Sequence, residues 1–273
     1  MKALITILVV LLLAAGVYIY FTNDTVRNTI TKALKSEPEQ IASIQTKYNA
    51  VFVIFDPSGS TNSTYSVPRI SVGFISAMID KLRSLGYGEI WLTYVRKDAY
   101  KANVLHFPIS KPPQPLVIPV RFGGEAKYKF NKRVEQYRLD SLDYVKKESI
   151  YQDSLNASEQ KFLSECEAII NNGYGKKKPG EDYSDIIGAL NAGTRSLGTV
   201  PHDSLHYRFI LLISDGCQSL PRGVSPKTLN RIPDDVKIIT VNHSGSGKSV
   251  VANRSTEVDN LDRSLEMIFK NDK

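Results

Sequence analysis

Hydrophobic and polar residues alternate along the chain in blocks that predict strands separated by helices. Residues 50–55 form an uninterrupted apolar run that ends at turn-forming residues, which is typical of a strand buried on both faces. Apolar positions at helical spacing over residues 68–85 predict the next helix, with Pro68 in its first turn and Gly86 after its end. The same criteria predict strands near residues 89–95, 103–107, 207–213 and 235–241, and helices near 184–197 and 260–269. This alternation predicts an α/β domain whose doubly wound, mostly parallel sheet is covered on both faces.

The segment from about residue 110 to residue 179 interrupts the alternation, and we interpret it as a helical insertion. It begins with an extended, proline-rich stretch and then has strong helical character over about residues 126–171. A narrow apolar stripe along this segment predicts an internal packing face, and a groove for a partner is the alternative. Its residues are Phe130, Val134, Tyr137, Tyr144, Tyr151, Leu155, Phe162, Cys166 and Ile169. Asn156 and Glu159 have the spacing of a capping box, which could start a second helix. The sequence is therefore compatible with one long helix and with a helical hairpin.

The N-terminus has the pattern of a membrane anchor. Residues 3–22 carry no charged side chain, and about 20 such residues span a bilayer. The Ala-Ala-Gly of residues 14–16 would also suit a cleavage site, so a cleaved signal peptide is the alternative. We expect an uncleaved single-pass transmembrane anchor at 1–22, a polar stalk at 23–47, and an α/β domain at 48–273 that contains the insertion. A domain that follows a single N-terminal span is commonly exported, so we expect it outside the cytoplasm, in the cell envelope.

Composition excludes several classes of protein. The chain has 273 residues, of which 42% are hydrophobic, so it can bury a sizeable core. Its net charge of +7 comes from scattered lysines and arginines, and the absence of a basic stripe with interleaved aromatic residues argues against nucleic-acid binding. The two cysteines, Cys166 and Cys217, exclude a disulfide framework and a four-cysteine zinc site. The sequence is compatible with a disulfide between them and with two free thiols.

Oxygen-bearing side chains follow two of the predicted strands and precede one predicted helix. Asp56, Ser58 and Ser60 follow the first strand, Asp215 follows the strand near 207–213, and Ser184 stands just before a helix. Open α/β sheets bind their ligands at the carboxyl ends of the strands. Hard divalent cations prefer oxygen ligands, so these residues predict a metal site at that edge. The alternative is that both aspartates only cap loops and helices, as Asp often does.

These residues resemble the metal-ion-dependent adhesion site of the von Willebrand factor A-type family. Asp56, Ser58 and Ser60 are similar to its Asp-x-Ser-x-Ser motif, Asp215 to its strand-Asp-Gly element, and Ser184 stands where the family has Thr. The resemblance covers about residues 48–108 and 180–270 and implies a Rossmann-like fold. It implies that Mg²⁺, or Mn²⁺, binds these five residues and accepts an acidic side chain from a protein ligand. Because no general base or nucleophile is needed, we expect binding and not an enzyme, with the insertion setting partner choice.

A second motif points to another class of function. Residues 245–249 resemble the end of a phosphate-binding P-loop, in which Gly247, Lys248 and Ser249 would bind a nucleotide. The full motif needs a glycine where this chain has Asn242. We therefore keep nucleotide binding as the alternative to metal-dependent binding of a protein.

Overall fold

The structure is a computed structural model, and it describes residues 48–57, 67–96, 103–175, 183–200, 206–225, 227–241, 249–251 and 253–269. The anchor predicted at residues 3–22 and the stalk at 23–47 lie outside these ranges. None of the helices in the described ranges is long and apolar enough to span a bilayer. Residues 116–142 belong to one compact unit, and the other described residues belong to a second unit.

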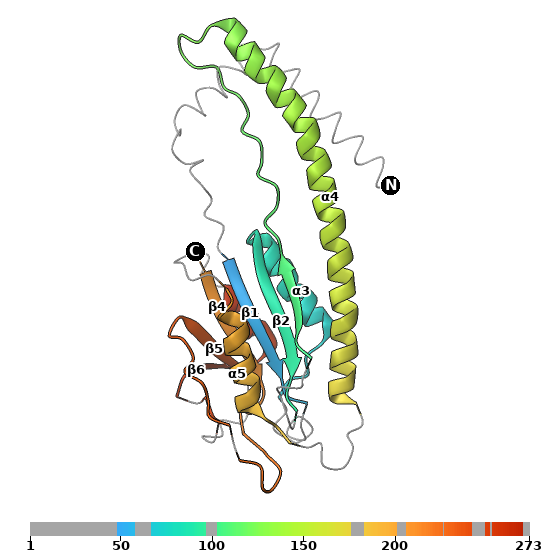
Figure 1. The fold of residues 1–273 in the computed structure, drawn as a ribbon, viewed down its shortest axis with the longest axis vertical. Helices are drawn as coiled ribbons and strands as arrows, with labels where there is room; N and C mark the ends of the chain where they lie inside the picture. The colour runs from blue at the N-terminus through green and yellow to red at the C-terminus, as the bar shows by residue number, and fades with distance from the viewer. Residues whose placement is uncertain are drawn as a thin grey trace. The chain divides into compact units, whose positions relative to one another are not determined.

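The second unit is built on a mixed six-stranded sheet in the order β3-β2-β1-β4-β5-β6 (Figure 1). Its strands are β1 (Tyr48–Phe55), β2 (Tyr87–Tyr94), β3 (Leu105–Ile109), β4 (His206–Ile213), β5 (Val236–Val241) and β6 (Ser255–Val258). β3 is antiparallel to β2, and all other neighbours are parallel. The predicted α/β class and mostly parallel sheet are therefore confirmed.

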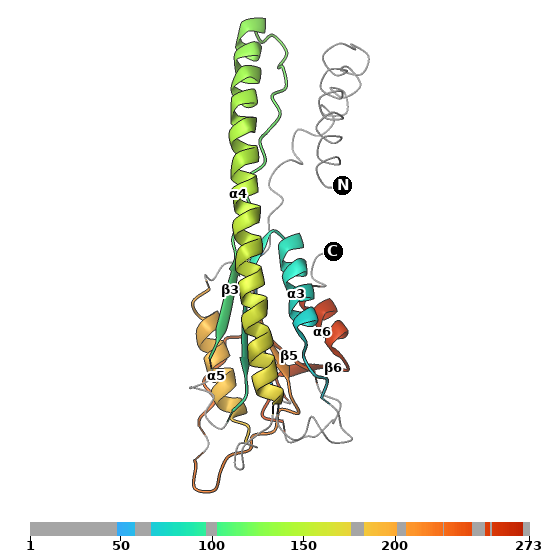
Figure 2. The ribbon, with the colours of Figure 1, turned by 90° about the vertical axis from the view of Figure 1, so that its right-hand side faces the viewer.

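Helices cover both faces of this sheet (Figure 2). The helices are α3 (Val72–Ser84), α4 (Lys127–Tyr174), α5 (Ile186–Leu197) and α6 (Leu261–Phe269). One core cluster joins the sheet to α3, α6 and the C-terminal half of α4, and the other joins it to α5. The resulting three-layer arrangement leaves the carboxyl edge of the parallel strands between the helical layers.

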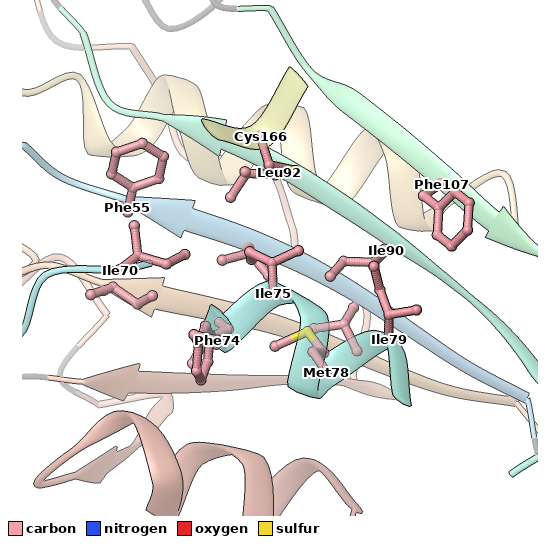
Figure 3. Packing of buried hydrophobic residues seen from close by; sticks show 14 of the residues in the cluster. Phe55, Ile70, Phe74, Ile75, Met78, Ile79, Ile90, Leu92, Phe107 and Cys166 are labelled. Carbon is pink, nitrogen blue, oxygen red and sulfur yellow. The ribbon is translucent and has the colours of Figure 1, made fainter. Parts of the chain in front are cut away.

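The apolar run of β1 is explained by burial on both faces. Alternate side chains of a strand point to opposite faces, so Val53 packs in the cluster with α3 and Phe52 in the cluster with α5. Figure 3 shows Ile79 of α3 next to Ile90 of β2, and both are fully buried. Burial of one such side chain stabilises the fold by roughly 1.5–3 kcal/mol. This rigid core fixes the positions of the strand ends.

α4 is one continuous helix of 48 residues, so the hairpin alternative is wrong. Asn156 and Glu159 lie inside it and do not cap a second helix. Both contact Arg83 of α3: the Asn156 Oδ1 accepts a hydrogen bond of 3.2 Å, and the Glu159 carboxylate forms an ion pair of 2.5 Å. In the C-terminal half of α4, Phe162 and Cys166 of the predicted stripe are buried in the core, as expected for a packing face.

The other differences from the sequence expectations are the start of α3 and the presence of β6. α3 begins at Val72 and not at Pro68, because Ser71 caps it and accepts a hydrogen bond from the Phe74 amide at 3.2 Å. Gly86 follows its end with φ of 106°, the conformation that favours glycine there. β6 was not predicted, because its four residues contain neither an apolar run nor regular alternation.

Candidate metal centre

The strand order reverses between β1 and β4. From β1 the chain continues through α3 to β2 on one side of β1, and it later returns through α5 to β4 on the other side. Crevices at such reversal points, outside the carboxyl ends of the strands, are the usual ligand sites of open α/β sheets. Asp56 follows β1, and Ser214 and Asp215 follow β4, so these residues stand at this point.

Asp56 is the centre of the candidate site. It is only 1% exposed, and its two carboxylate oxygens accept hydrogen bonds from serines of two distant segments. The Ser184 Oγ donates to Oδ1 at 3.2 Å and the Ser214 Oγ to Oδ2 at 3.0 Å. Burying a carboxylate costs free energy unless it is hydrogen-bonded or neutralised. The two serine hydroxyls therefore help to stabilise Asp56 in its buried position. The structure thus brings together two predicted ligands, Asp56 and Ser184.

Ser214 was not among the predicted ligands. It lies opposite Asp56 because β1 and β4 are in register up to the pair Phe55 and Ile213, and the Asp56 amide continues the ladder by donating to the Ile213 carbonyl at 2.9 Å. The Ser214 Oγ also accepts from the amide of Gly216 at 3.0 Å. The sequence shows a serine after an apolar strand, but strand register is the signal that would have selected it.

Asp215 is half-buried and lies at the start of the turn that follows β4. Its Oδ1 accepts a hydrogen bond from the Cys217 amide at 2.9 Å, so one of its oxygens stabilises the turn. Gly216 has φ of 70°, and a Cβ atom there would approach the Ser249 Oγ to 2.1 Å. The turn therefore requires glycine, and Ser249 lies directly beside it.

The backbone around Ser184 is held by two neighbouring loops. Ser184 and Ser219 form an isolated antiparallel bridge, with amide-to-carbonyl distances of 2.8 and 3.0 Å. The next amide, that of Asp185, donates to the Arg96 carbonyl after β2 at 3.0 Å. These bonds fix the position from which the Ser184 hydroxyl reaches Asp56.

Asp185 is a second buried carboxylate at this edge, and its partners differ from those of Asp56. It caps α5 by accepting from the Gly188 amide at 2.9 Å, and it also accepts from Gln218 at 3.2 Å and Lys227 at 2.8 Å. Burial acts to raise the pKa of this carboxyl, but the Lys227 ammonium and the other donors outweigh it and lower the pKa overall. The contacts of Asp185 therefore indicate a structural role.

An aromatic cluster lies beneath this edge on the α4 side of the sheet. The Phe55 ring is 5.6 Å from that of Tyr94 and 5.5 Å from that of Tyr174. The guanidinium of Arg96 lies over Tyr94 at 4.1 Å and that of Arg69 over Tyr174 at 5.1 Å. Two exposed arginines are thus positioned by stacking near the end of β1, a feature that sequence reasoning missed.

Both cysteines are free thiols. Cys166 is fully buried in α4, and burial raises its pKa to about 12. Cys217 is half-buried in the turn after Asp215. Of the two alternatives left open by the sequence, the free-thiol state is the one observed.

Several predicted site residues lie outside the described ranges. They are Ser58, Ser60, Gly247 and Lys248. Within the described ranges there is no group of three or more His, Cys, Asp or Glu residues that could hold a metal ion. The predicted ligand set contains two carboxylates and three hydroxyls.

No family model matches the chain, and no curated protein matches it either. The family resemblance therefore stays a prediction that rests on the motif residues.

Proposed function

We propose that the protein is a membrane-tethered domain of the von Willebrand factor A type that binds a protein ligand through a divalent cation. In this proposal Mg²⁺ or Mn²⁺ is held by Asp56, Ser58, Ser60, Ser184 and Asp215. The sheet is then the Rossmann-like sheet of that family, and residues 3–22 attach the chain to a membrane with the domain outside the cytoplasm.

The observation that carries the proposal is the buried carboxylate of Asp56. It accepts from Ser184 and Ser214, which are 128 and 158 residues away in the sequence, at the point where the strand order reverses. A serine hydroxyl that donates its proton keeps lone pairs with which it can bind a cation. Carboxylates and hydroxyls are the oxygen donors that Mg²⁺ accepts, so the chemistry of the described residues fits this ion.

The resemblance supplies the division of roles. Ser58 and Ser60 coordinate directly, the two aspartates act partly through water, and Ser184 coordinates in one state of the site. Few direct protein charges on the ion leave it electrophilic, so a carboxylate from the partner completes its coordination. The cation supplies binding energy and no bond is broken, which makes this a binding function and not an enzymatic one.

Charge near the site suits an acidic partner. Arg69 and Arg96 are exposed and are held by the rings of Tyr174 and Tyr94. A protein ligand that offers one carboxylate to the cation can place further acidic groups near these guanidinium groups. The insertion at about residues 110–179 contributes Tyr174 to this cluster, which supports its proposed role in partner choice.

Calorimetric titration of the full chain with MgCl₂ and MnCl₂ tests the proposal. We expect saturable binding of one ion by the unmodified protein and its loss in Asp56→Asn. Asp185→Asn is the matched control, because it removes the charge of the other buried carboxylate at this edge and leaves the side chains of all five proposed ligands unchanged. Equal binding by all three proteins would overturn the proposed site.

A second titration distinguishes nucleotide binding from metal-dependent binding of a protein. Ser249 lies beside Gly216, which brings one residue of the P-loop-like segment close to Asp215. If that segment binds a nucleotide, ATP should stabilise the protein and Lys248→Ala should remove the effect. Our proposal predicts that Lys248→Ala leaves binding of Mg²⁺ unchanged.

A further inference from the structure

Large apolar side chains are exposed around the turn that leads into α4. We call residues 117–133 the tip. Within it Val117 is 77% exposed, Ile118 67%, Phe122 66% and Tyr128 69%. Exposed apolar groups that gather in one short segment commonly mark a surface that binds a partner or a membrane.

The turn is held in place by its own contacts. The Glu125 carboxylate accepts from the Phe122 amide at 3.2 Å and from the Arg133 guanidinium at 3.1 and 2.6 Å. Arg133 also donates to the Val120 carbonyl at 2.9 Å, and its guanidinium lies 4.9 Å from the centre of the Phe122 ring. The exposed apolar residues are therefore presented by a defined structure.

Charge distinguishes the tip from the rest of the exposed helix. The tip contains five basic residues and one acid, which gives it a net charge of +4. Because Arg133 pairs with Glu125, four exposed basic residues are not matched by an acid within the tip: Arg121, Lys127, Lys129 and Lys132. Residues 134–150 expose Leu139, Leu142, Val145 and Ile150, but their three basic and four acidic residues give a net charge of −1.

We propose that the tip binds the surface of a bilayer that contains anionic lipids. Exposed aromatic and aliphatic side chains next to lysines and arginines suit this surface, because the apolar groups enter the interface while the cationic groups pair with lipid phosphates. Each Lys or Arg near an anionic surface strengthens binding about fivefold. This contact is additional to the anchor predicted at residues 3–22 and does not depend on the metal site.

The test uses the full chain in nanodiscs, with an environment-sensitive fluorophore on the tip. Ile118→Cys is labelled in a Cys217→Ser background, because the remaining thiol of Cys166 is fully buried and its pKa is raised to about 12. In discs of phosphatidylcholine and phosphatidylserine at 3:1 we expect a blue-shifted emission that brominated lipids quench. In pure phosphatidylcholine we expect neither effect. Leu142→Cys, which lies on α4 outside the tip and is as exposed as Ile118 (68% against 67%), is the matched label control and should respond in neither disc.

A variant with fewer positive charges on the tip tests whether electrostatic attraction to anionic lipid causes the docking. Replacing Lys127, Lys129 and Lys132 by Gln should lower the ratio of docked to undocked tip about 100-fold in anionic discs. Replacing Lys146, Lys147 and Lys161 by Gln removes equal charge from the same helix and should have little effect. An equal shift in neutral discs, no shift in either disc, or a shift that persists without lipid and grows with protein concentration would overturn the proposal. The last result would indicate a second copy of the chain as the partner.

Discussion

Asp56 and Asp185 are two carboxylates at the same edge of the sheet, each 1% exposed, and they are stabilised in different ways. Asp185 accepts from an ammonium, a side-chain amide and the first turn of α5. Asp56 accepts from the hydroxyls of Ser184 and Ser214. Asp185 is paired with a positive side chain, whereas the two hydroxyls that donate to Asp56 belong to groups that can themselves bind hard cations. A place at the strand ends is therefore not enough to predict a metal ligand, and the proposed role of Asp56 rests also on the chemistry of its partners.

The largest expected effect is on stability at Asp185. Asp185→Ala removes the cap of α5 and leaves Lys227 without its buried partner, so we expect a loss of about 3 kcal/mol in the free energy of unfolding. Asp56→Asn without metal should cost less than about 1 kcal/mol, because the serine hydroxyls can reorient toward the amide. Urea denaturation in EDTA measures both. Equal losses would mean that the two carboxylates play the same structural role.

Added metal should distinguish these two residues in the opposite order, because only the change at Asp56 should remove the stability that metal binding adds. At a concentration of 100 times the dissociation constant, a bound cation stabilises the folded protein by about 2.7 kcal/mol. We expect this gain in the unmodified chain and in Asp185→Asn, and none in Asp56→Asn. Thermal unfolding with and without MnCl₂ measures it. A gain that survives Asp56→Asn would place the cation elsewhere.

Removal of the hydroxyl at residue 184 should have a smaller effect. Ser184→Ala removes one proposed ligand and one donor to Asp56, and we expect affinity for Mn²⁺ to fall about tenfold, which corresponds to about 1.4 kcal/mol. Ser184→Thr keeps the hydroxyl and should retain affinity. Ser219→Ala is the control, because Ser219 holds Ser184 through backbone groups alone. An unchanged affinity in Ser184→Ala would remove this residue from the site.

The smallest expected effect is on the pH dependence of stability. The pKa of Asp185 is lowered in the folded protein from an ordinary value of 3.8, so its charge stabilises the fold above that pH and the gain is lost as pH falls through the folded pKa. Lys227→Met removes the strongest group that lowers this pKa. The stability difference between the two proteins should therefore be constant above about pH 5 and shrink below 3.8. Acid titration in EDTA tests this, and a difference that grows toward low pH would contradict it.

The hydrophobic pattern was sufficient for most of the fold. The uninterrupted run of β1 and the helical spacing of α3 were visible because burial on both faces or along one stripe leaves a direct trace in the sequence. β6 left no such trace, since only Val258 of its four residues is buried. The continuity of α4 was not decided by the pattern, because Asn156 and Glu159 have capping spacing whether or not a helix begins there.

The candidate site was predictable in part. Asp56 and Ser184 were selected from their places next to a strand and a helix, and the structure joins them through a hydrogen bond of 3.2 Å. Ser214 was missed because its contact with Asp56 follows from the register of β1 and β4, which the sequence does not encode locally. The pairing of Asp185 with Lys227 was also missed, because the two residues are 42 positions apart in the chain.

Anomalous scattering from crystals of the protein soaked in Mn²⁺ would locate the proposed cation. We predict one anomalous peak at the carboxyl edge of the sheet, within about 2.1 Å of a serine hydroxyl oxygen and bridged directly or through water to Asp56 and Asp215. The absence of a peak there, or a peak at Asp185 in its place, would contradict the account.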